Sequence, residues 1–263
     1  MFCEFENVQI IFQKIVDLGL VFWDSCFTHG NTKHNKLVKM RTQKLLITAA
    51  AALVAGIVSS QAQVYSQNIV GYVNTILPNG NTAISNPLLN GDGTNGAENV
   101  LTSLQIGDGL LVWNGAGYSG YTYGGPGAWL DQNGNPTSQP TLAQGGGFFY
   151  QNGQGVNETN TFVGTVVLTN TVILPNGNTL VGSTVPIADT ADGTNINLPL
   201  QVGDGLLTWN GAGYNGYTYG GPGAWLDQNG NPTAAPVISV GAGFFYQNGQ
   251  GVNETWIQNL VVQ

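Results

Sequence analysis

The chain has 263 residues, of which only 8% are charged, and its formal net charge at pH 7 is −8. All lysines, arginines, histidines and cysteines precede residue 45, so the region from Gln63 onward has no base and no thiol. This composition excludes Ser-His-Asp, Cys-His and Schiff-base chemistry in that region. It also excludes zinc sites made of His or Cys and the neutralisation of nucleic-acid phosphates.

Residues 40–62 have the three parts of a secretory signal peptide. Arg41 and Lys44 form a positive start, an apolar stretch of 14 residues follows at 45–58, and small residues precede Gln63. That stretch is too short to cross a membrane, because a transmembrane helix needs about 20 apolar residues. We therefore predict a cleaved signal and a secreted product (extracellular, at the cell surface or periplasmic) without a transmembrane anchor. A short anchor or a buried helix is the alternative.

Residues 1–39 would place this signal far from the N-terminus, where secretory signals begin. We interpret them as a spurious N-terminal extension and Met40 as the true start. The cysteines and histidines of this segment do not follow the spacing of a zinc site.

The exported region consists of two copies of one module. Residues 106–159 recur at 202–255 with an offset of 96, and 44 of the 54 positions are identical. Self-similarity of this kind indicates a duplicated structural unit. Two motifs also recur upstream at slightly larger offsets: ILPNGNT at 76–82 and 173–179, and DGTN at 92–95 and 192–195. We place the modules at residues 63–168 and 169–263.

Short runs rich in aromatic and β-branched residues alternate with Asn-Gly and Gly-Asp-Gly turns, which is typical of antiparallel β-structure. In the first module we predict strands at residues 70–77, 110–113, 118–123, 128–130, 148–150 and 162–168. The strand at 110–113 is apolar at every position, so both of its faces should be covered. The segments 162–168 and 257–262 each follow an Asn-Glu-Thr loop, and we expect each to close its module. The fold class is therefore all-β, with two tandem antiparallel β-sandwich or small-barrel modules.

Clusters of tyrosine and tryptophan are the candidate ligand-binding residues. Tyr121 and Tyr123 share one face of a predicted strand. Aromatic rings beside Asn and Asp suit sugar recognition, because rings stack on the apolar faces of sugars while polar groups hydrogen-bond the hydroxyls. The alternative is that the rings fill the core. The candidates are Tyr118, Tyr121, Tyr123 and Trp129, with their copies Tyr214, Tyr217, Tyr219 and Trp225.

Two loops place oxygen-bearing side chains at alternate positions, as loops that bind hard cations do. They consist of Asp131, Asn133 and Asn135 in the first module and Asp227, Asn229 and Asn231 in the second. Calcium is therefore the one candidate cofactor. The loops lack the later Glu of an EF-hand, and Asn-Gly alone favours a tight hairpin turn, so a plain turn is the alternative.

Only carboxylates could support catalysis after residue 62. A glycosidase needs two carboxyl groups facing one bond. Each module has three candidates: Asp108, Asp131 and Glu158, matched by Asp204, Asp227 and Glu254. All of them lie in or beside predicted turns and loops, where acidic residues commonly have structural roles. We therefore predict no enzyme activity and keep an acid-only glycosidase-like enzyme as an alternative.

Three patterns carry a resemblance to a group of secreted bacterial proteins built from one or more β-modules. They are the signal, the segment NIVGYVN at residues 68–74, and the succession of WNG, W and GFFY in each module. The resemblance covers residues 63–263. It implies export and a β-fold, and it implies no activity and no site residues.

The leading functional prediction is a secreted or cell-surface, non-catalytic structural or interaction protein. A carbohydrate-binding protein that uses the tyrosine and tryptophan clusters is the first alternative, and the glycosidase-like enzyme is the second. The expected partners are glycans or envelope components, and the lack of bases excludes nucleic acid.

Export predicts a defined mature N-terminus. The exported protein should begin at or near Gln63, because Ser60 and Ala62 place small residues at the −3 and −1 positions of a cleavage site. Mass spectrometry of the intact exported protein measures this end. Peptides from residues 1–39 in a digest of whole cells would contradict the interpretation of that segment.

Overall fold

The computed structural model describes residues 69–91 and 93–260. All of these described residues belong to one compact unit, which contains both repeats. The predicted signal peptide at 40–62 and the segment 1–39 lie outside the described residues. Within the described part of the chain, no helix is long and apolar enough to cross a membrane.

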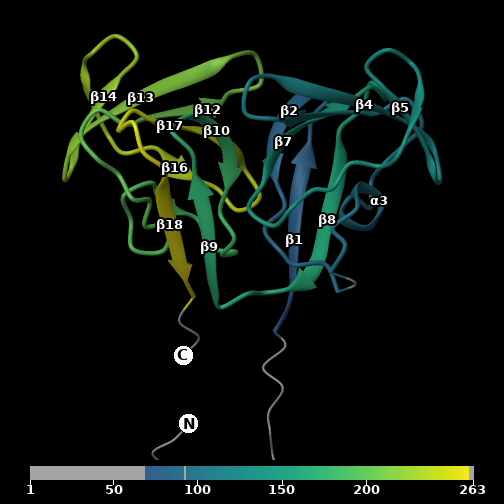
Figure 1. Cartoon of the computed structure of the whole chain (residues 1–263), viewed down its shortest axis with the longest axis horizontal. Helices are drawn as coiled ribbons and strands as arrows, with labels where there is room; N and C mark the ends of the chain where they lie inside the picture. Colours follow the sequence, from purple (N-terminus) through teal and green to yellow (C-terminus); the bar gives the residue numbers. More distant parts are fainter. Residues whose placement is uncertain (1–68, 92, 261–263) are drawn as a thin grey trace, which may run out of the picture. The chain divides into compact units, whose positions relative to one another are not determined.

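The all-β fold class is confirmed, since antiparallel sheets and one short helix make up the regular structure of the described residues (Figure 1). Module 1 contains β1 (Val70–Leu77), β2 (Gly80–Ser85), α3 (Ala97–Val100), β3 (Gly109–Trp113), β4 (Tyr118–Gly125), β5 (Ala128–Asp131), β6 (Pro136–Thr137), β7 (Gly147–Asn152) and β8 (Glu158–Thr165). Module 2 contains β9 (Thr169–Leu174), β10 (Gly177–Gly182), β11 (Asp189–Thr190), β12 (Gly205–Trp209), β13 (Tyr214–Gly221), β14 (Ala224–Asp227), β15 (Pro232–Thr233), β16 (Val237–Ile238), β17 (Gly243–Asn248) and β18 (Glu254–Asn259).

Each module combines a six-stranded sheet with a two-stranded ribbon. In module 1 the sheet has the order β2-β7-β3-β4-β5-β6, and the ribbon is β1-β8. Module 2 repeats this with the sheet β10-β17-β12-β13-β14-β15, the ribbon β18-β9 and an additional pair, β11-β16. The strand pairing thus follows the sequence repeat, and the ladders of the two ribbons separate between Thr165 and Thr169.

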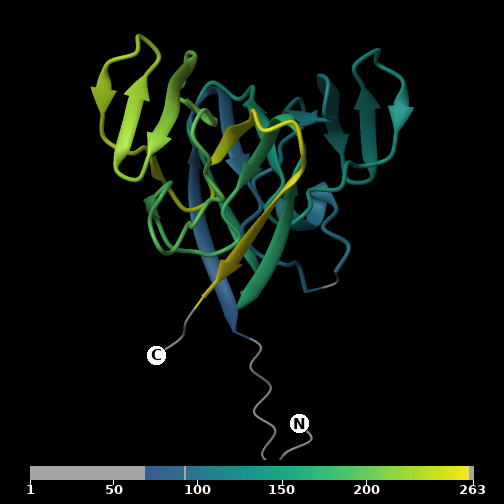
Figure 2. The same ribbon diagram turned by 60° about the vertical axis from the view of Figure 1, so that its left-hand side comes forward.

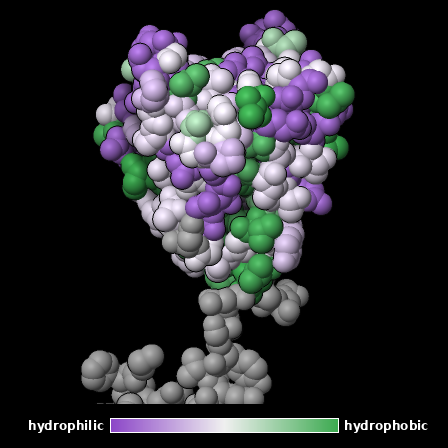
Figure 3. All heavy atoms as spheres, turned by 90° about the vertical axis from the view of Figure 1, so that its right-hand side faces the viewer, coloured by the Kyte–Doolittle hydropathy of each residue, from purple (hydrophilic) through white to green (hydrophobic). Residues whose placement is uncertain are grey.

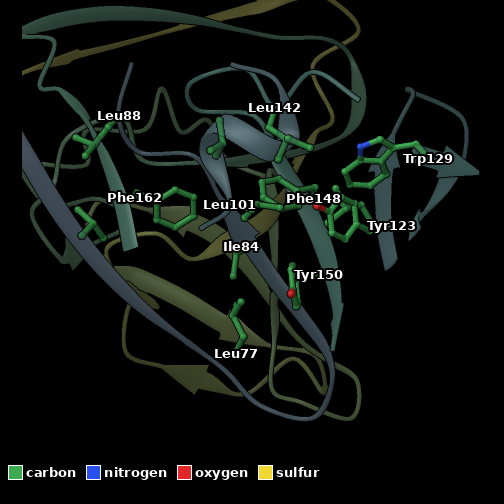
Figure 4. Close-up of a cluster of buried hydrophobic side chains, with 14 of the residues drawn as sticks. Leu77, Ile84, Leu88, Leu101, Tyr123, Trp129, Leu142, Phe148, Tyr150 and Phe162 are labelled. Carbon is green, nitrogen blue, oxygen red and sulfur yellow. The ribbon is translucent and has the colours of Figure 1, made fainter. Parts of the chain in front are cut away.

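The ribbon and the sheet of each module enclose one hydrophobic core. In module 1, Leu77 and Phe162 of the ribbon belong to the same buried cluster as Ile84, Phe148 and Tyr150 of the sheet (Figure 4). Inward and outward residues alternate along β1 and β8, as the period of a strand requires. The core is therefore built from one face of each layer.

The strand β3 is covered on both faces, as its apolar sequence predicts. Leu110 is fully buried in the core of module 1, and Val112 packs against that core. Leu111 and Trp113, on the opposite face, pack against a separate buried cluster that contains residues of both modules. One strand thus supports both the core and the junction with module 2.

Several elements differ from the sequence prediction. β2 and β6 were not predicted as strands, and β18 begins at Glu254 instead of at 257. β8 begins at Glu158 and ends at Thr165 instead of spanning 162–168, because it pairs with the whole length of β1. Its polar residues Glu158 and Asn160, which interrupt the apolar pattern, lie on the buried face. The helix α3 was not predicted, since four residues are too few to show helical periodicity.

The two modules pack through the inner strands of their sheets, β2 and β7 against β10 and β17. The backbones approach each other closely at glycines. A Cβ added to Gly243 would lie 2.6 Å from the carbonyl oxygen of Ile84, and one added to Gly147 would lie 2.8 Å from the Leu180 side chain. A side chain at either position would separate the modules, so the junction depends on residues that have none.

Contacts across the junction occur in reciprocal pairs. The ring centroids of Trp113 and Phe245 lie 5.1 Å apart, and those of Trp209 and Phe149 lie 5.2 Å apart. Because Trp113 and Phe149 correspond to Trp209 and Phe245 in the repeat, each contact is the copy of the other. The indole N–H groups form reciprocal hydrogen bonds as well. Trp113 Nε1 donates to Asn178 O at 3.0 Å, and Trp209 Nε1 donates to Asn81 O at 2.8 Å. Such isologous contacts characterise a twofold-symmetric dimer, which is here fused into one chain.

Replacing Gly243 by alanine is expected to lower the melting temperature, because the new Cβ would collide with the carbonyl group of Ile84. Overpacking of this kind typically destabilises by about 1–3 kcal/mol. The matched control is Gly117→Ala, whose Cβ would meet no heavy atom within 4 Å. Thermal melting compares the two variants, and equal melting temperatures would contradict the close approach at Gly243.

Candidate functional site

The outer part of each six-stranded sheet projects away from the rest of its module (Figure 2). It consists of the end of β4 with β5 and β6 in module 1, and of the end of β13 with β14 and β15 in module 2. We call these segments, Gly120–Thr137 and Gly216–Thr233, the wings. Their 18 residues are identical in the two modules. The wings contain the candidate calcium loops and all candidate aromatic residues except Tyr118 and Tyr214. The other candidate acids, Asp108 and Glu158 with their copies Asp204 and Glu254, lie outside the wings.

Two of the predicted aromatic residues of each wing lie in the core. Tyr123 and Trp129 are 8% and 2% exposed, and their ring centroids are 5.1 Å apart. Trp129 lies at the edge of the buried cluster in Figure 4. Its Nε1 donates a 2.7 Å hydrogen bond to Glu98 Oε1. Module 2 repeats this arrangement with Tyr219, Trp225 and Asp192. Neither ring pair therefore presents an open face on which a sugar could stack.

The predicted residues Tyr118 and Tyr214 lie at the junction between the modules. Their hydroxyl oxygens are 3.3 Å apart. Burial, together with the hydrogen bond to Tyr214, raises the pKa of Tyr118. Because the two tyrosines are copies of each other, their hydrogen bond lies at the centre of the pseudo-twofold arrangement. They join the modules and are separate from the wings.

Tyr121 and Tyr217 are the predicted aromatic residues that stay partly exposed on the wings. Each packs against the edge of its module core. In the strand ladder, Tyr121 lies opposite Asp131 and Tyr217 lies opposite Asp227. Each wing therefore places one accessible ring beside one carboxylate.

The opposite face of each wing carries uncharged residues. Thr122, Leu130 and Pro136 are cross-strand neighbours there and are all exposed. Gln132 packs beside Gly120 on the same face. The copies in module 2 are exposed as well: Thr218, Leu226, Pro232 and Gln228. On the side of the molecule seen in Figure 3, hydrophobic residues form separate patches among hydrophilic and intermediate ones.

The loops predicted to bind calcium are turns closed by their own aspartate. Asp131 Oδ1 accepts hydrogen bonds from the N–H groups of Asn133 and Asn135 at 2.8 Å each, and Oδ2 accepts one from the Asn135 side chain at 3.3 Å. These bonds, first of all that from the Asn135 backbone, lower the pKa of Asp131. Asp227, Asn229 and Asn231 repeat this geometry. Among the described residues, no group of three or more His, Cys, Asp or Glu side chains could hold a metal ion.

Two acids of module 1 that were candidates under the glycosidase alternative meet around the hydroxyl group of Tyr150. Its oxygen lies 2.5 Å from Asp108 Oδ2 and 2.9 Å from Glu158 Oε2. Asp108 also accepts the Gln105 backbone N–H at 2.8 Å and the Gln154 side-chain amide at 3.0 Å. Asp108 is fully buried and Glu158 is 8% exposed. We call Tyr150, Asp108 and Glu158, and their copies in module 2, the acid–tyrosine clusters.

The cluster of module 2 has the same geometry. The Tyr246 hydroxyl oxygen lies 2.6 Å from Asp204 Oδ2 and 2.5 Å from Glu254 Oε2. Burial, followed by the hydrogen bonds to the acids, raises the pKa of Tyr246, and burial with the Asp108 hydrogen bond does the same for Tyr150. A substrate bond has no place between the two carboxyl groups, because the phenol occupies that position. In module 1 the cluster thus links β7 and β8 to the turn before β3, and in module 2 it links β17 and β18 to the turn before β12.

All nine acidic residues of the described chain accept hydrogen bonds from the protein itself. They are Glu98, Asp108, Asp131, Glu158, Asp189, Asp192, Asp204, Asp227 and Glu254. No lysine, arginine or histidine is present in this part of the sequence. The donors are backbone N–H groups and the side chains of Trp, Tyr, Gln and Asn, so the carboxylates serve as structural acceptors.

Trp113, Phe149 and Tyr150 were not among the site residues predicted from the sequence. Alternation along β3 does place Trp113 on the face opposite Leu110. The partner on that face, however, belongs to the other module, which a local pattern does not reveal. Tyr150 follows Phe148 on one strand face, and that spacing is common to all core residues of a strand.

Millimolar Ca²⁺ and a chelator are both expected to leave the melting temperature unchanged, because Asp131 and Asp227 already accept the N–H groups of their loops. Asp131→Ala combined with Asp227→Ala should instead lower the melting temperature at neutral pH. Since the folded-state pKa of both groups is lowered, their stabilisation is present above the ordinary Asp pKa of about 3.9 and is lost as the pH falls below it. A calcium-dependent rise in melting temperature that the double variant abolishes would contradict the plain-turn interpretation.

The resemblance to secreted bacterial β-modules stays a prediction from the sequence, and the function of the chain has to be inferred from the residue placement described above. Comparison with family models, with curated proteins and with solved structures finds no match.

Proposed function

We propose that the chain is an exported, non-catalytic interaction protein that presents the same neutral surface twice, once on each wing. One observation carries the proposal: all exposed wing residues are identical in the two modules, whereas some buried residues of the closing strands differ. Exposed positions usually accept substitutions with effects within about 0.5 kcal/mol. Stability therefore does not account for the identity of the two wing surfaces, and a shared binding role does.

The divergence of the buried positions supports this argument. Asn160 and Phe162 on the buried face of β8 correspond to Trp256 and Gln258 in β18, and all four side chains are buried. Core substitutions are the costly ones, because they require compensating changes in volume and hydrogen bonding. At these two positions the modules have thus diverged although substitution there is costly, whereas the exposed wing residues have stayed identical.

The placement of the acids supports a role without catalysis. Asp108 and Glu158 meet around Tyr150, but both are buried and engaged in hydrogen bonds. Asp131 is held by its own loop. A glycosidase requires two carboxyl groups that are open to the substrate, and the described acids of either module do not provide such a pair.

The expected partner is uncharged or cationic. The region from Gln63 onward has ten acids and no base, so it would be repelled by an anionic surface. On the outer face of each wing, Leu130 and Pro136 offer apolar contact, while Thr122 and Gln132 offer hydrogen bonds. A neutral component of the cell envelope fits this combination.

Carbohydrate binding is the second candidate, and the position of Tyr121 and Tyr217 favours it. Each ring is partly exposed and lies opposite an aspartate, Asp131 or Asp227. A ring for stacking beside a hydrogen-bond acceptor is the combination that sugar recognition uses. Under this candidate the other predicted aromatic residues support the wing without touching the sugar.

Replacing Leu130 and Leu226 by aspartate is expected to weaken binding to purified cell envelopes at least about tenfold, because a charge would be desolvated at each contact surface. Co-sedimentation measures the bound fraction. The matched control is Ile106→Asp with Val202→Asp, which adds the same charge at two apolar residues, each 70% exposed, outside the wings. Equal loss in both variants, or no loss in the wing variant, would overturn the assignment of the wings.

A panel of neutral polysaccharides separates the two candidates. Specific binding that is lost in Tyr121→Ala with Tyr217→Ala would establish the carbohydrate candidate. Binding to cell envelopes without affinity for any glycan of the panel would instead support the first candidate, an interaction protein whose partner is not a glycan. Hydrolysis of a glycan by the purified chain would contradict a non-catalytic role in either case.

A further inference from the structure

Two oxidisable phenols meet where the modules join. The hydroxyl oxygens of Tyr118 and Tyr214 lie 3.3 Å apart, and no other hydrogen bond joins two tyrosines among the described residues. This distance is longer than the about 2.8 Å that is typical of an O–H···O bond. The two hydroxyl groups are therefore in contact without being held tightly, and the rings have some freedom to shift against each other.

Each of the two tyrosines has a tryptophan beside it. The ring centroids of Trp113 and Tyr118 are 5.2 Å apart, and those of Trp209 and Tyr214 are 5.1 Å apart. All four rings are partly exposed, so an oxidant in the solvent reaches them. An indole that is oxidised first takes an electron from the tyrosine in contact with it. The tryptophans thus enlarge the surface through which the tyrosine pair is oxidised.

The tyrosines directly follow the hairpin turns at residues 114–117 and 210–213, which connect β3 to β4 and β12 to β13. A Cβ added to Gly115 or Gly117 would meet no heavy atom within 4 Å, and the corresponding glycines of module 2 are equally open. The backbone beside each ring therefore has room to move. A bond between the two rings needs only a small shift of this kind.

The composition of the chain limits which covalent links its modules could form. From Gln63 onward the sequence has no cysteine and no lysine, which excludes disulfides and lysine isopeptide bonds. It has no methionine either, so no sulfur atom of this region competes with the aromatic rings for an oxidant. Coupling of two tyrosine rings is an oxidative link that requires none of these residues.

We propose that the junction is an oxidative cross-linking site, at which Tyr118 and Tyr214 become joined as dityrosine with a peroxide as the oxidant. Each phenol loses the hydrogen atom of its O–H bond, and one hydrogen peroxide takes up both hydrogen atoms and is reduced to two waters. The unpaired electron of each ring is shared with the carbons next to the hydroxyl, and a bond forms between one such carbon of each ring. The hydrogen atoms on these two carbons then move to the oxygens, which restores both phenols.

The bond would connect equivalent residues of the two modules, 96 positions apart in the sequence. A cross-link that closes so long a loop restricts the unfolded chain and thereby stabilises the folded one. It would hold the modules together in the way a disulfide does in other proteins. Because the tyrosine pair lies outside the wings, the proposal does not depend on what the wings bind.

Oxidation of the purified full-length chain with hydrogen peroxide and a haem peroxidase tests the site. A protease that cuts after Asp and Glu should then release a cross-linked peptide that contains residues 118 and 214. Its mass should be lower by two hydrogen atoms than the sum of the two separate peptides, and it should show the fluorescence of dityrosine. The melting temperature of the cross-linked monomer should rise by about 10 °C.

Two phenylalanine variants separate proximity from exposure. Tyr118→Phe keeps the ring but removes the hydroxyl group, and it should lose both the cross-linked peptide and the rise in melting temperature. Tyr72→Phe is the matched control, because Tyr72 is 72% exposed and lies on β1 outside the junction. This control should keep the peptide that joins residues 118 and 214.

The competing outcome is coupling that follows exposure alone. It would give products that join Tyr72 residues of two different molecules and no peptide that joins residues 118 and 214, and this result would overturn the proposal. An unchanged yield of the monomeric cross-link in Tyr118→Phe would overturn it as well. Melting of the unoxidised variants checks that both have folded.

Discussion

The carboxylates of the described chain have to be satisfied without any cation, and much of the structure depends on how this is achieved. Each acid accepts neutral donors that come from another element or from its own turn. Glu98 in α3 holds the indole of Trp129 and thereby the base of the wing. Asp108 joins the turn before β3 to Tyr150 in β7, and Asp131 closes the hairpin at the tip of the wing. Acids that would form ion pairs in a chain of ordinary composition are here hydrogen-bond acceptors that position backbone and aromatic groups.

The duplication is used in two different ways. Around the junction, the copies form reciprocal contacts, with glycines that let the backbones approach and aromatic rings that exchange places. In the ribbons the copies have diverged by moving a large side chain two residues along the strand, which keeps it on the inner face. In module 1 the smaller residue of the pair is Asn160, opposite Thr75 on β1. The buried atoms Thr75 Oγ1 and Asn160 Nδ2 have no hydrogen-bond partner there. In module 2, Trp256 occupies the position of Asn160, and its Nε1 donates a 2.7 Å hydrogen bond to Ile196 O.

A fused pair of modules with identical wings suits a partner that offers repeated contact points. When one wing is bound, the second wing is held at a high effective concentration, so two weak contacts can give strong overall binding. The acid–tyrosine clusters lie at a different place, inside each module, where they connect the closing strand to the six-stranded sheet.

Much of this architecture was predictable from the sequence alone. The repeat, the turn residues and the alternation in segments such as 110–113 predicted two β-modules and two covered faces of β3, because strand period and turn chemistry are local properties. The placement of the aromatic residues was decided by tertiary structure. Tyr118, Tyr121 and Tyr123 follow one another in a single strand, yet one lies at the junction, one is partly exposed and one is buried. Local spacing assigns a residue to a strand face, but only the packing of the other module and of the ribbon decides which part of that face is covered and which remains open to a partner.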